Sequence, residues 1–174
     1  AFTEGLPSYD YDPEAARALA VGVVGRTPNR AAALAVATRL AEFPVPARIL
    51  LLPILADRAD PALLPAIAKA AEDADGGVRV AALTALGQAG DASVVPALSR
   101  ALGAGVPDPE RAAAGRSLER LASPGTDAAI VAQLQSPDAI LRAALIRCLG
   151  ARRARGAVPG ILAAAKAPEA PVRL

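Results

Sequence analysis

An arginine recurs along the whole chain at an almost constant interval. Successive members of the series are 31, 31, 32, 31 and 31 residues apart, so only one of the five intervals carries an insertion. The series consists of Arg17, Arg48, Arg79, Arg111, Arg142 and Arg173, and we call it the arginine ladder. A fixed period of this size predicts that the chain is an array of one repeated structural unit.

Apolar residues keep the same phase as the ladder. Seven positions after the arginines stand Val24, Leu55, Leu86, Leu118 and Leu149. Nineteen positions after them stand Val36, Ile67, Leu98, Ile130 and Ile161. The one-residue insertion falls in Gly103–Asp108, a stretch of loop-forming residues. These positions predict a core to which every repeat contributes in the same way.

The composition predicts helices that pack closely. Hydrophobic residues make up 53% of the chain but aromatic residues only 2%, so alanine, leucine, valine and isoleucine must form the core. Alanine is the best helix former, and β-branched residues never alternate over a run as long as a strand. We therefore expect an all-α protein in which small side chains let the helices approach one another.

Each repeat is predicted to be a helical hairpin. Helix A opens just before the ladder arginine, runs for about twelve residues and ends near Gly25, Gly87 or Gly150. Helix B follows a short loop, and its expected N-caps are Asn29, Asp60, Asp91 and Ser123. Prolines in the first two turns of helix B, which shorten or bend it, are Pro65, Pro96 and Pro159.

Stacking is expected because a lone hairpin of this size cannot bury its apolar face. About five hairpins side by side form a right-handed α-solenoid, a superhelix with two layers of helices. The predicted repeats are residues 12–42, 43–73, 74–105, 106–136 and 137–167, with a partial sixth at 168–174. We assign residues 1–174 to this single repeat domain.

Two segments carry a resemblance to a known family. DGGVRVAALTALG (Asp75–Gly87) and DAILRAALIRCLG (Asp138–Gly150) resemble HEAT-like repeats of the phycobilisome-lyase type, as in bacterial HEAT repeat proteins. The resemblance implies that the ladder arginines are structural and bond to acids and carbonyls in neighbouring turns. An arginine near the start of an apolar helix needs partners for five donors, and acids four residues earlier are the expected ones. They are Asp75, Asp138 and Glu169.

The residues that usually perform catalysis are missing. The chain has no histidine and one cysteine, which removes the commonest general base and the usual zinc ligand sets. It also lacks a haem-attachment motif, a phosphate-binding loop and a nucleophile elbow. Ser93, Ser99 and Ser117 have no base to activate them, and Cys148 is expected to be a small buried apolar side chain. The sequence predicts a protein that is not an enzyme and has neither cofactor nor metal.

The exposed face of the B helices is the predicted partner-binding surface. A loose column of polar side chains lies there, and small residues separate its members. The column consists of Arg39, Lys69, Arg100, Gln133 and Lys166. By analogy with the family this face is concave and would suit a protein or peptide, preferably an acidic one. The competing interpretation is a solvated face with local ion pairs such as Lys69 with Glu72.

A second interpretation places function on the loops within the hairpins. These loops collect arginines, and the candidates on this basic edge are Arg120, Arg152, Arg153 and Arg155. The edge would support weak nucleic-acid binding. Aromatic residues for base stacking are absent from it, because all four aromatics lie in the first quarter of the chain, so nucleic acid is the less favoured partner. A third interpretation is a docking arm of a larger enzyme.

The sequence says little about the cellular setting. Its longest apolar stretch, near residues 49–55, is interrupted by Pro53 and falls short of the roughly 20 residues of a membrane helix. A cytoplasmic location is slightly favoured over export with later removal of a signal segment. The formal charge of +2 is too small to indicate a partner, and the oligomeric state stays open.

Overall fold

The structure is a computed structural model, and it describes residues 30–165. Within this range the chain is all-helical and contains no strand. The A helices are α3 (Val45–Ala56), α5 (Gly76–Ala89), α7 (Asp108–Arg120) and α9 (Ala139–Ala151). The B helices are α2 (Arg30–Thr38), α4 (Leu64–Ala70), α6 (Val95–Arg100), α8 (Thr126–Gln133) and α10 (Val158–Ala165). Short 3-10 turns are η2 (Leu40–Glu42), η3 (Pro61–Leu63), η4 (Ala92–Val94) and η5 (Arg155–Ala157).

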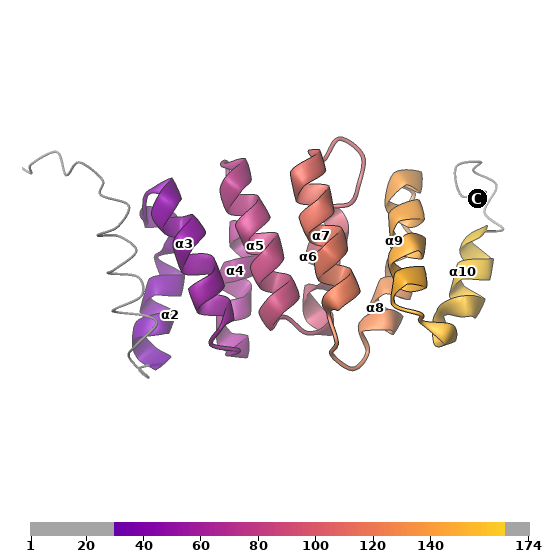
Figure 1. Ribbon diagram of the computed structural model, residues 1–174, viewed down its shortest axis with the longest axis horizontal. Coiled ribbons are helices and arrows are strands. Elements are labelled where there is room, and N and C mark those ends of the chain that lie inside the picture. Colours follow the sequence, from indigo (N-terminus) through magenta and orange to yellow (C-terminus); the bar gives the residue numbers. More distant parts are fainter. Residues whose placement is uncertain (1–29, 166–174) are drawn as a thin grey trace, which may run out of the picture.

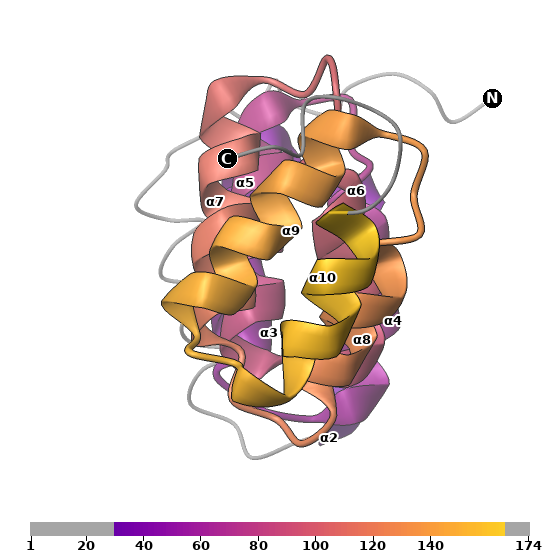
Figure 2. The same cartoon turned by 90° about the vertical axis from the view of Figure 1, so that its right-hand side faces the viewer.

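The helices form two layers that run along the long axis of the molecule. The A helices stand side by side (Figure 1), and the end view places them in one layer and the B helices in the other (Figure 2). This arrangement is an α-solenoid, so the predicted fold class is confirmed. The right-handed sense of the superhelix and the outer limits of the domain stay predictions. Helix A of the first repeat and the partial sixth repeat lie outside the described residues.

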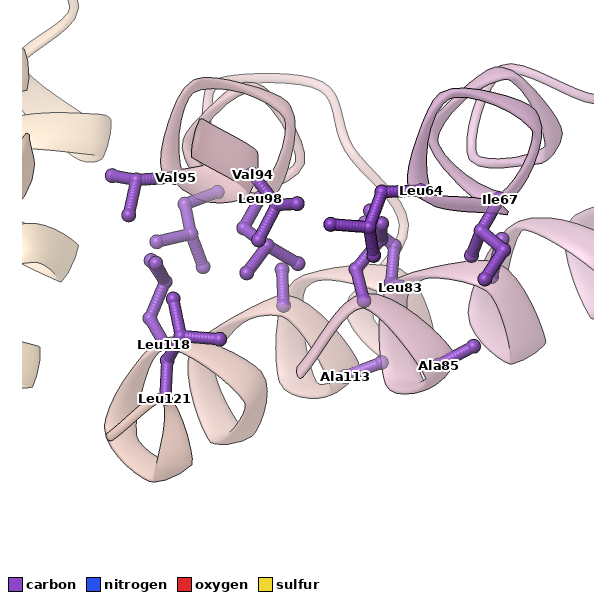
Figure 3. Packing of buried hydrophobic residues seen from close by; sticks show 14 of the residues in the cluster. Leu64, Ile67, Leu83, Ala85, Val94, Val95, Leu98, Ala113, Leu118 and Leu121 are labelled. Carbon is purple, nitrogen blue, oxygen red and sulfur yellow. The ribbon is translucent and has the colours of Figure 1, made fainter. Parts of the chain in front are cut away.

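The core lies between the layers and consists of the periodic apolar positions. Leu55, Leu86, Leu118 and Leu149 are each at most 1% exposed, and Ile67, Leu98 and Ile130 are fully buried. In Figure 3, Val94, Val95 and Leu98 of the B layer face Leu118 and Leu121. The two columns predicted from the sequence are therefore the core, apart from Val36 and Ile161, which are half-buried, and Val24, which lies outside the described residues.

Helix starts agree largely with the capping chemistry of the sequence. The carboxylates of Asp75 and Asp138 accept hydrogen bonds from backbone N–H groups in the first turns of α5 and α9. Asp60 and Asp91 likewise cap η3 and η4, the turns that lead into α4 and α6. Pro65 and Pro96 lie in the first turns of α4 and α6, where proline is tolerated, and these helices are 7 and 6 residues long.

One predicted helix cap is wrong. Ser123 does not cap α8, because Gly125 takes the N-cap position with a left-handed φ of 81° and the Ser123 hydroxyl bonds to Thr126 instead. The expected N-cap Asn29 lies outside the described residues. The A helices end near the predicted glycines, because α5 ends at Ala89, two residues after Gly87, and α9 ends at Ala151, one residue after Gly150. The α5 glycine has another role, because it faces Ser117 of α7 at close range.

Candidate partner-binding site

The arginine ladder is tied to the turns between repeats. The Arg79 Nη1 donates to the backbone oxygens of Asp73 at 2.7 Å and Ala74 at 2.9 Å. Its Nη2 donates to Glu110 Oε1 of the next repeat at 2.7 Å, and the Glu110 side chain is only 8% exposed. This hydrogen bond raises the pKa of the Arg79 guanidinium above its ordinary value. Arg79 therefore links one turn to the next repeat.

Other ladder members make related contacts. Arg142 is 3% exposed and donates from Nη1 to the Ser136 backbone oxygen at 2.7 Å, at the same offset as Arg79 to Asp73. Arg48 forms an ion pair with Asp73, which connects it to the same turn. Arg111 differs, because it pairs with Asp108 at 2.6 Å and keeps a third of its side chain exposed. Arg17 and Arg173 lie outside the described residues.

The expected acidic partners of Arg79 and Arg142 are not the ones they bond. Asp75 and Asp138, four residues before these arginines, use their carboxylates to cap helix starts. The arginines reach backbone oxygens five or six residues earlier instead. Asp75 acts on Arg79 only as a nearby charge that raises its pKa, and its effect is smaller than that of Glu110. Glu169, the third expected partner, lies outside the described residues.

The predicted partner-binding column lies at the C-terminal ends of the B helices. Arg39 follows α2 directly, Lys69 is in the last turn of α4, and Arg100 is the last residue of α6. These three side chains are exposed, while Gln133, the last residue of α8, is half-buried. Lys166 lies outside the described residues. Cations are favoured at these positions by the negative end of the helix dipole, even without a ligand.

Two of these three cations are already neutralised. Arg39 pairs with Glu42 at 2.7 Å, which raises the pKa of its guanidinium, and Arg100 pairs with Glu72 of the preceding repeat at 2.9 Å. The expected pair of Lys69 with Glu72 does not form. Lys69 makes no ion pair with any residue of the described part of the chain. The column is therefore a series of surface ion pairs around one uncompensated ammonium group.

Lys69 lines a groove between α2 and α4. The groove has a volume of about 450 Å³, and most of its wall is apolar. Its lining residues are Ala37, Thr38, Leu40, Ala41, Arg48, Pro65, Ala66, Lys69, Ala70, Glu72 and Asp73. The corresponding space between α4 and α6 is smaller, about 180 Å³. We call the larger space the α2–α4 groove, and its volume and apolar wall would accommodate a side chain of a partner.

The four arginines of the predicted basic edge fall into two groups, because one is bound within the protein and three are exposed. Arg152 donates from Nη1 to the backbone oxygens of Leu118 at 2.7 Å and Leu121 at 2.6 Å, and from Nε to Asp127 at 2.6 Å. It thus holds the C-terminal end of α7, and its side chain is only 12% exposed. Arg120, Arg153 and Arg155 are exposed.

Two exposed arginines were missed by the sequence analysis. Arg116 and Arg147 each lie five residues after a ladder arginine, on the outer faces of α7 and α9. Their shared offset from the ladder is the signal that could have revealed them. The offset occurs in only two of the repeats, so it does not stand out as a column.

The candidate nucleophiles have structural contacts. Ser117 is buried and donates to the Leu83 backbone oxygen at 2.9 Å. Burial raises the pKa of the Cys148 thiol to about 11, which keeps it protonated and unreactive at neutral pH. Ser99 is 1% exposed. In the part of the chain that the structure describes, no three potential metal-ligating side chains come together.

Stacked hairpins with a shared core and a repeated arginine contact define an α-solenoid repeat protein. The family model for HEAT repeats matches residues 39–119, which cover the second and third repeats and most of α7. Residues 39–119 are therefore HEAT-like repeats, and the phycobilisome-lyase subtype stays a prediction. HEAT repeats are commonly noncatalytic scaffolds for protein interaction. The search of curated proteins finds no match. Between residues 30 and 165, no helix has both the length and the apolarity needed to cross a bilayer.

Proposed function

We propose that this protein is a noncatalytic scaffold that binds a protein or peptide on the B-helix face, with the α2–α4 groove as its main contact. The observation that carries the proposal is the combination of an apolar groove with an uncompensated Lys69 in its wall. The groove would take an apolar side chain, and the ammonium group would pair with a carboxylate of the same ligand. A short acidic peptide with one large apolar residue has both features.

The ion pairs beside the groove support this assignment in a second way. Arg39 with Glu42 and Arg100 with Glu72 place both signs of charge next to Lys69. Such exposed pairs contribute little to stability, about 0–1 kcal/mol each, so a ligand can rearrange them at small cost. The rim would therefore select the orientation of the peptide more than it would add affinity.

A peptide display selection against the wild-type protein tests the proposal, because a random library contains acidic, basic and apolar peptides alike. We expect enrichment of peptides that contain an acidic and a large apolar residue. Lys69→Glu should abolish their binding, Lys69→Arg should retain it, and Thr38→Trp, which fills the groove from α2, should block it. Arg153→Glu, in an exposed loop outside the groove, is the control and should leave binding unchanged. If no selected peptide loses affinity in both groove variants, the groove assignment is refuted.

A further inference from the structure

The positive charge of the chain is concentrated in its last repeats. Residues 111–157 contain eight arginines and three acidic residues, a formal charge of +5. Residues 30–110 contain seven basic and nine acidic residues, a formal charge of −2. The small net charge of the whole chain hides this asymmetry. A local excess of this size attracts anionic partners to one end of the molecule.

Most of this excess is not compensated inside the protein. Within residues 111–157, Arg111 pairs with Asp108 and Arg152 with Asp127, while Arg142 is buried. The remaining arginines are exposed and form no ion pair with any described residue. They are Arg116, Arg120, Arg147, Arg153 and Arg155. Elsewhere the exposed arginines of the B layer are paired, as Arg39 and Arg100 show.

The unpaired arginines belong to the A layer and the loop that follows it. Arg116 and Arg120 are one turn apart on α7, where they line a small depression of about 100 Å³ against α5. Arg147 lines the neighbouring groove of about 360 Å³ between α7 and α9. The two helices are visible as neighbours in the A layer in Figure 1. Both helices belong to the A layer, which the end view shows on the opposite side of the molecule from the B helices (Figure 2).

The α7–α9 groove has a physical cause in the repeat. In the preceding pair of A helices, Gly87 lets Ser117 approach α5 closely. The residue equivalent to Gly87 in α7 is Glu119, and its side chain lines the α7–α9 groove together with Cys148, the equivalent of Ser117. The glutamate side chain in α7 thus replaces the hydrogen atom of the glycine in α5. As a result, α7 and α9 pack less closely and a space remains between them. Small residues, among them Ala112, Gly115 and Ala144, line part of this space.

We propose that the outer face of α7 and α9 is a second docking surface, and that its occupant is an acidic amphipathic segment of a partner protein. Carboxylates of the segment would pair with Arg116, Arg120 and Arg147, because guanidinium groups bind carboxylates in a bidentate manner. An apolar side chain would enter the α7–α9 groove beside Ala112 and Ala144. This surface is separate from the B-helix face, so the protein would bridge two partners.

The lining favours a protein segment over nucleic acid. The groove wall offers small apolar residues but no aromatic side chain on which a base could stack. Glu119 lies in the same groove as Arg147 and would repel a continuous phosphate backbone laid across both helices. The discrete carboxylates of a helical segment can be spaced around Glu119. An acidic amphipathic segment would therefore contact both the arginines and the apolar groove wall of this surface, whereas a phosphate backbone would contact only the arginines.

The test measures binding of a synthetic probe by fluorescence anisotropy. The probe is a labelled helical peptide in which glutamate pairs alternate with leucines. We expect it to bind the wild-type protein, with affinity that falls as salt rises. Replacement of its leucines by serine should weaken binding, because the groove then loses its apolar contact. The same peptide with lysine in place of glutamate should not bind.

Matched variants locate the surface. In the Lys69→Glu background, where the α2–α4 groove no longer competes for the probe, Arg116→Glu/Arg120→Glu/Arg147→Glu should raise Kd about tenfold or more, while the corresponding lysine variant should retain most of the affinity. Arg39→Glu/Lys69→Glu/Arg100→Glu carries the same charge change on the other layer and should keep the probe bound at the outer face. Circular dichroism melting confirms that all variants fold.

The outcomes separate this inference from the proposed function. No binding of the acidic probe, or binding that the outer-face variant leaves intact, would overturn the second surface. Loss of binding only in the B-layer variant would also overturn it, while supporting the α2–α4 groove. A titration with a short DNA duplex forms the last arm: duplex binding without binding of the acidic peptide would refute the choice of a protein partner.

Discussion

Gly87 of α5 and Ser117 of α7 are in direct contact, and the contact leaves no room for a side chain on the glycine. A Cβ added to Gly87 would lie 2.6 Å from the Ser117 Cα, closer than such atoms can approach. The Ser117 hydroxyl also donates to the Leu83 backbone oxygen of α5 at 2.9 Å. Gly87 and Ser117, which face each other across α5 and α7, thus set the spacing of these two neighbouring A helices.

Gly87→Ala should therefore destabilise the protein. The added methyl group must separate α5 from α7 or bend one of them, and such overpacking typically costs about 1–3 kcal/mol. The matched control is Gly150→Ala, the same position in α9, where an added Cβ meets nothing within 4 Å. There the substitution should stabilise the helix by roughly 0.5–1 kcal/mol. Urea unfolding followed by circular dichroism measures both changes, and equal effects would refute the close-contact argument.

The loop between α6 and α7 should loosen in acid. Its Ala104 N–H donates to Asp138 Oδ2 at 2.8 Å, which lowers the pKa of Asp138 together with its bonds to the first turn of α9. Because the folded pKa lies below the unfolded value of about 3.9, the unfolded state binds more protons near that pH. This contribution to the unfolding free energy is thus complete at neutral pH and is lost as the pH falls through the folded pKa.

Asp138→Asn isolates that effect. Asparagine still caps a helix start, so the variant should lose little of the capping interaction at α9. The difference in unfolding free energy from the wild type should be largest at neutral pH and shrink toward pH 3. Urea titrations at a series of pH values check this, and a difference that does not change with pH would show that the Asp138 charge has no structural effect.

The repeated part of the fold was predictable from the sequence because each position is decided by its neighbours in adjacent repeats. Leu86 and Ile67 are buried, as their columns predicted, since every hairpin must cover the one beside it. Pairings between turns were not predictable in this way. Asp75 serves as a helix cap, so Arg79 turns to carbonyl oxygens and to Glu110, a choice set by three-dimensional geometry.

The candidate site was only partly predictable for the same reason. The column of Arg39, Lys69 and Arg100 follows the period and was found, but its charge depends on partners from other repeats, such as Glu72 for Arg100. The α7–α9 groove arises from one local departure, Glu119 in place of glycine. A search for periodic positions overlooks single residues that differ from the repeat pattern. These residues nevertheless create the surface features by which one repeat differs from another.

Cys148 should be protected from alkylation in the folded protein. Its thiol is buried, with a pKa of about 11, so at pH 8 roughly one molecule in a thousand carries the thiolate that reacts. An unfolded cysteine, with a pKa of about 8.5, reacts far faster. Iodoacetamide labelling with and without urea, followed by mass spectrometry, measures the ratio. Similar rates in both conditions would show that the α7–α9 groove opens enough to expose the sulfur.

The arginine ladder predicts a loss of stability when one of its members is removed. Arg79→Ala leaves the Glu110 carboxylate, which is 8% exposed, without its partner, which is 25% exposed. The cost should therefore lie between the roughly 0–1 kcal/mol of an exposed pair and the roughly 3–5 kcal/mol of a fully buried one. Arg79→Ala/Glu110→Gln should recover part of this loss, because a neutral amide no longer needs a counter-charge. Arg153→Ala, in an exposed loop, should change the melting temperature little. Thermal unfolding of the four proteins tests the order. A melting temperature of Arg79→Ala equal to that of the wild type would mean that the ladder is a solvated stripe, and its arginines would then be candidates for partner binding.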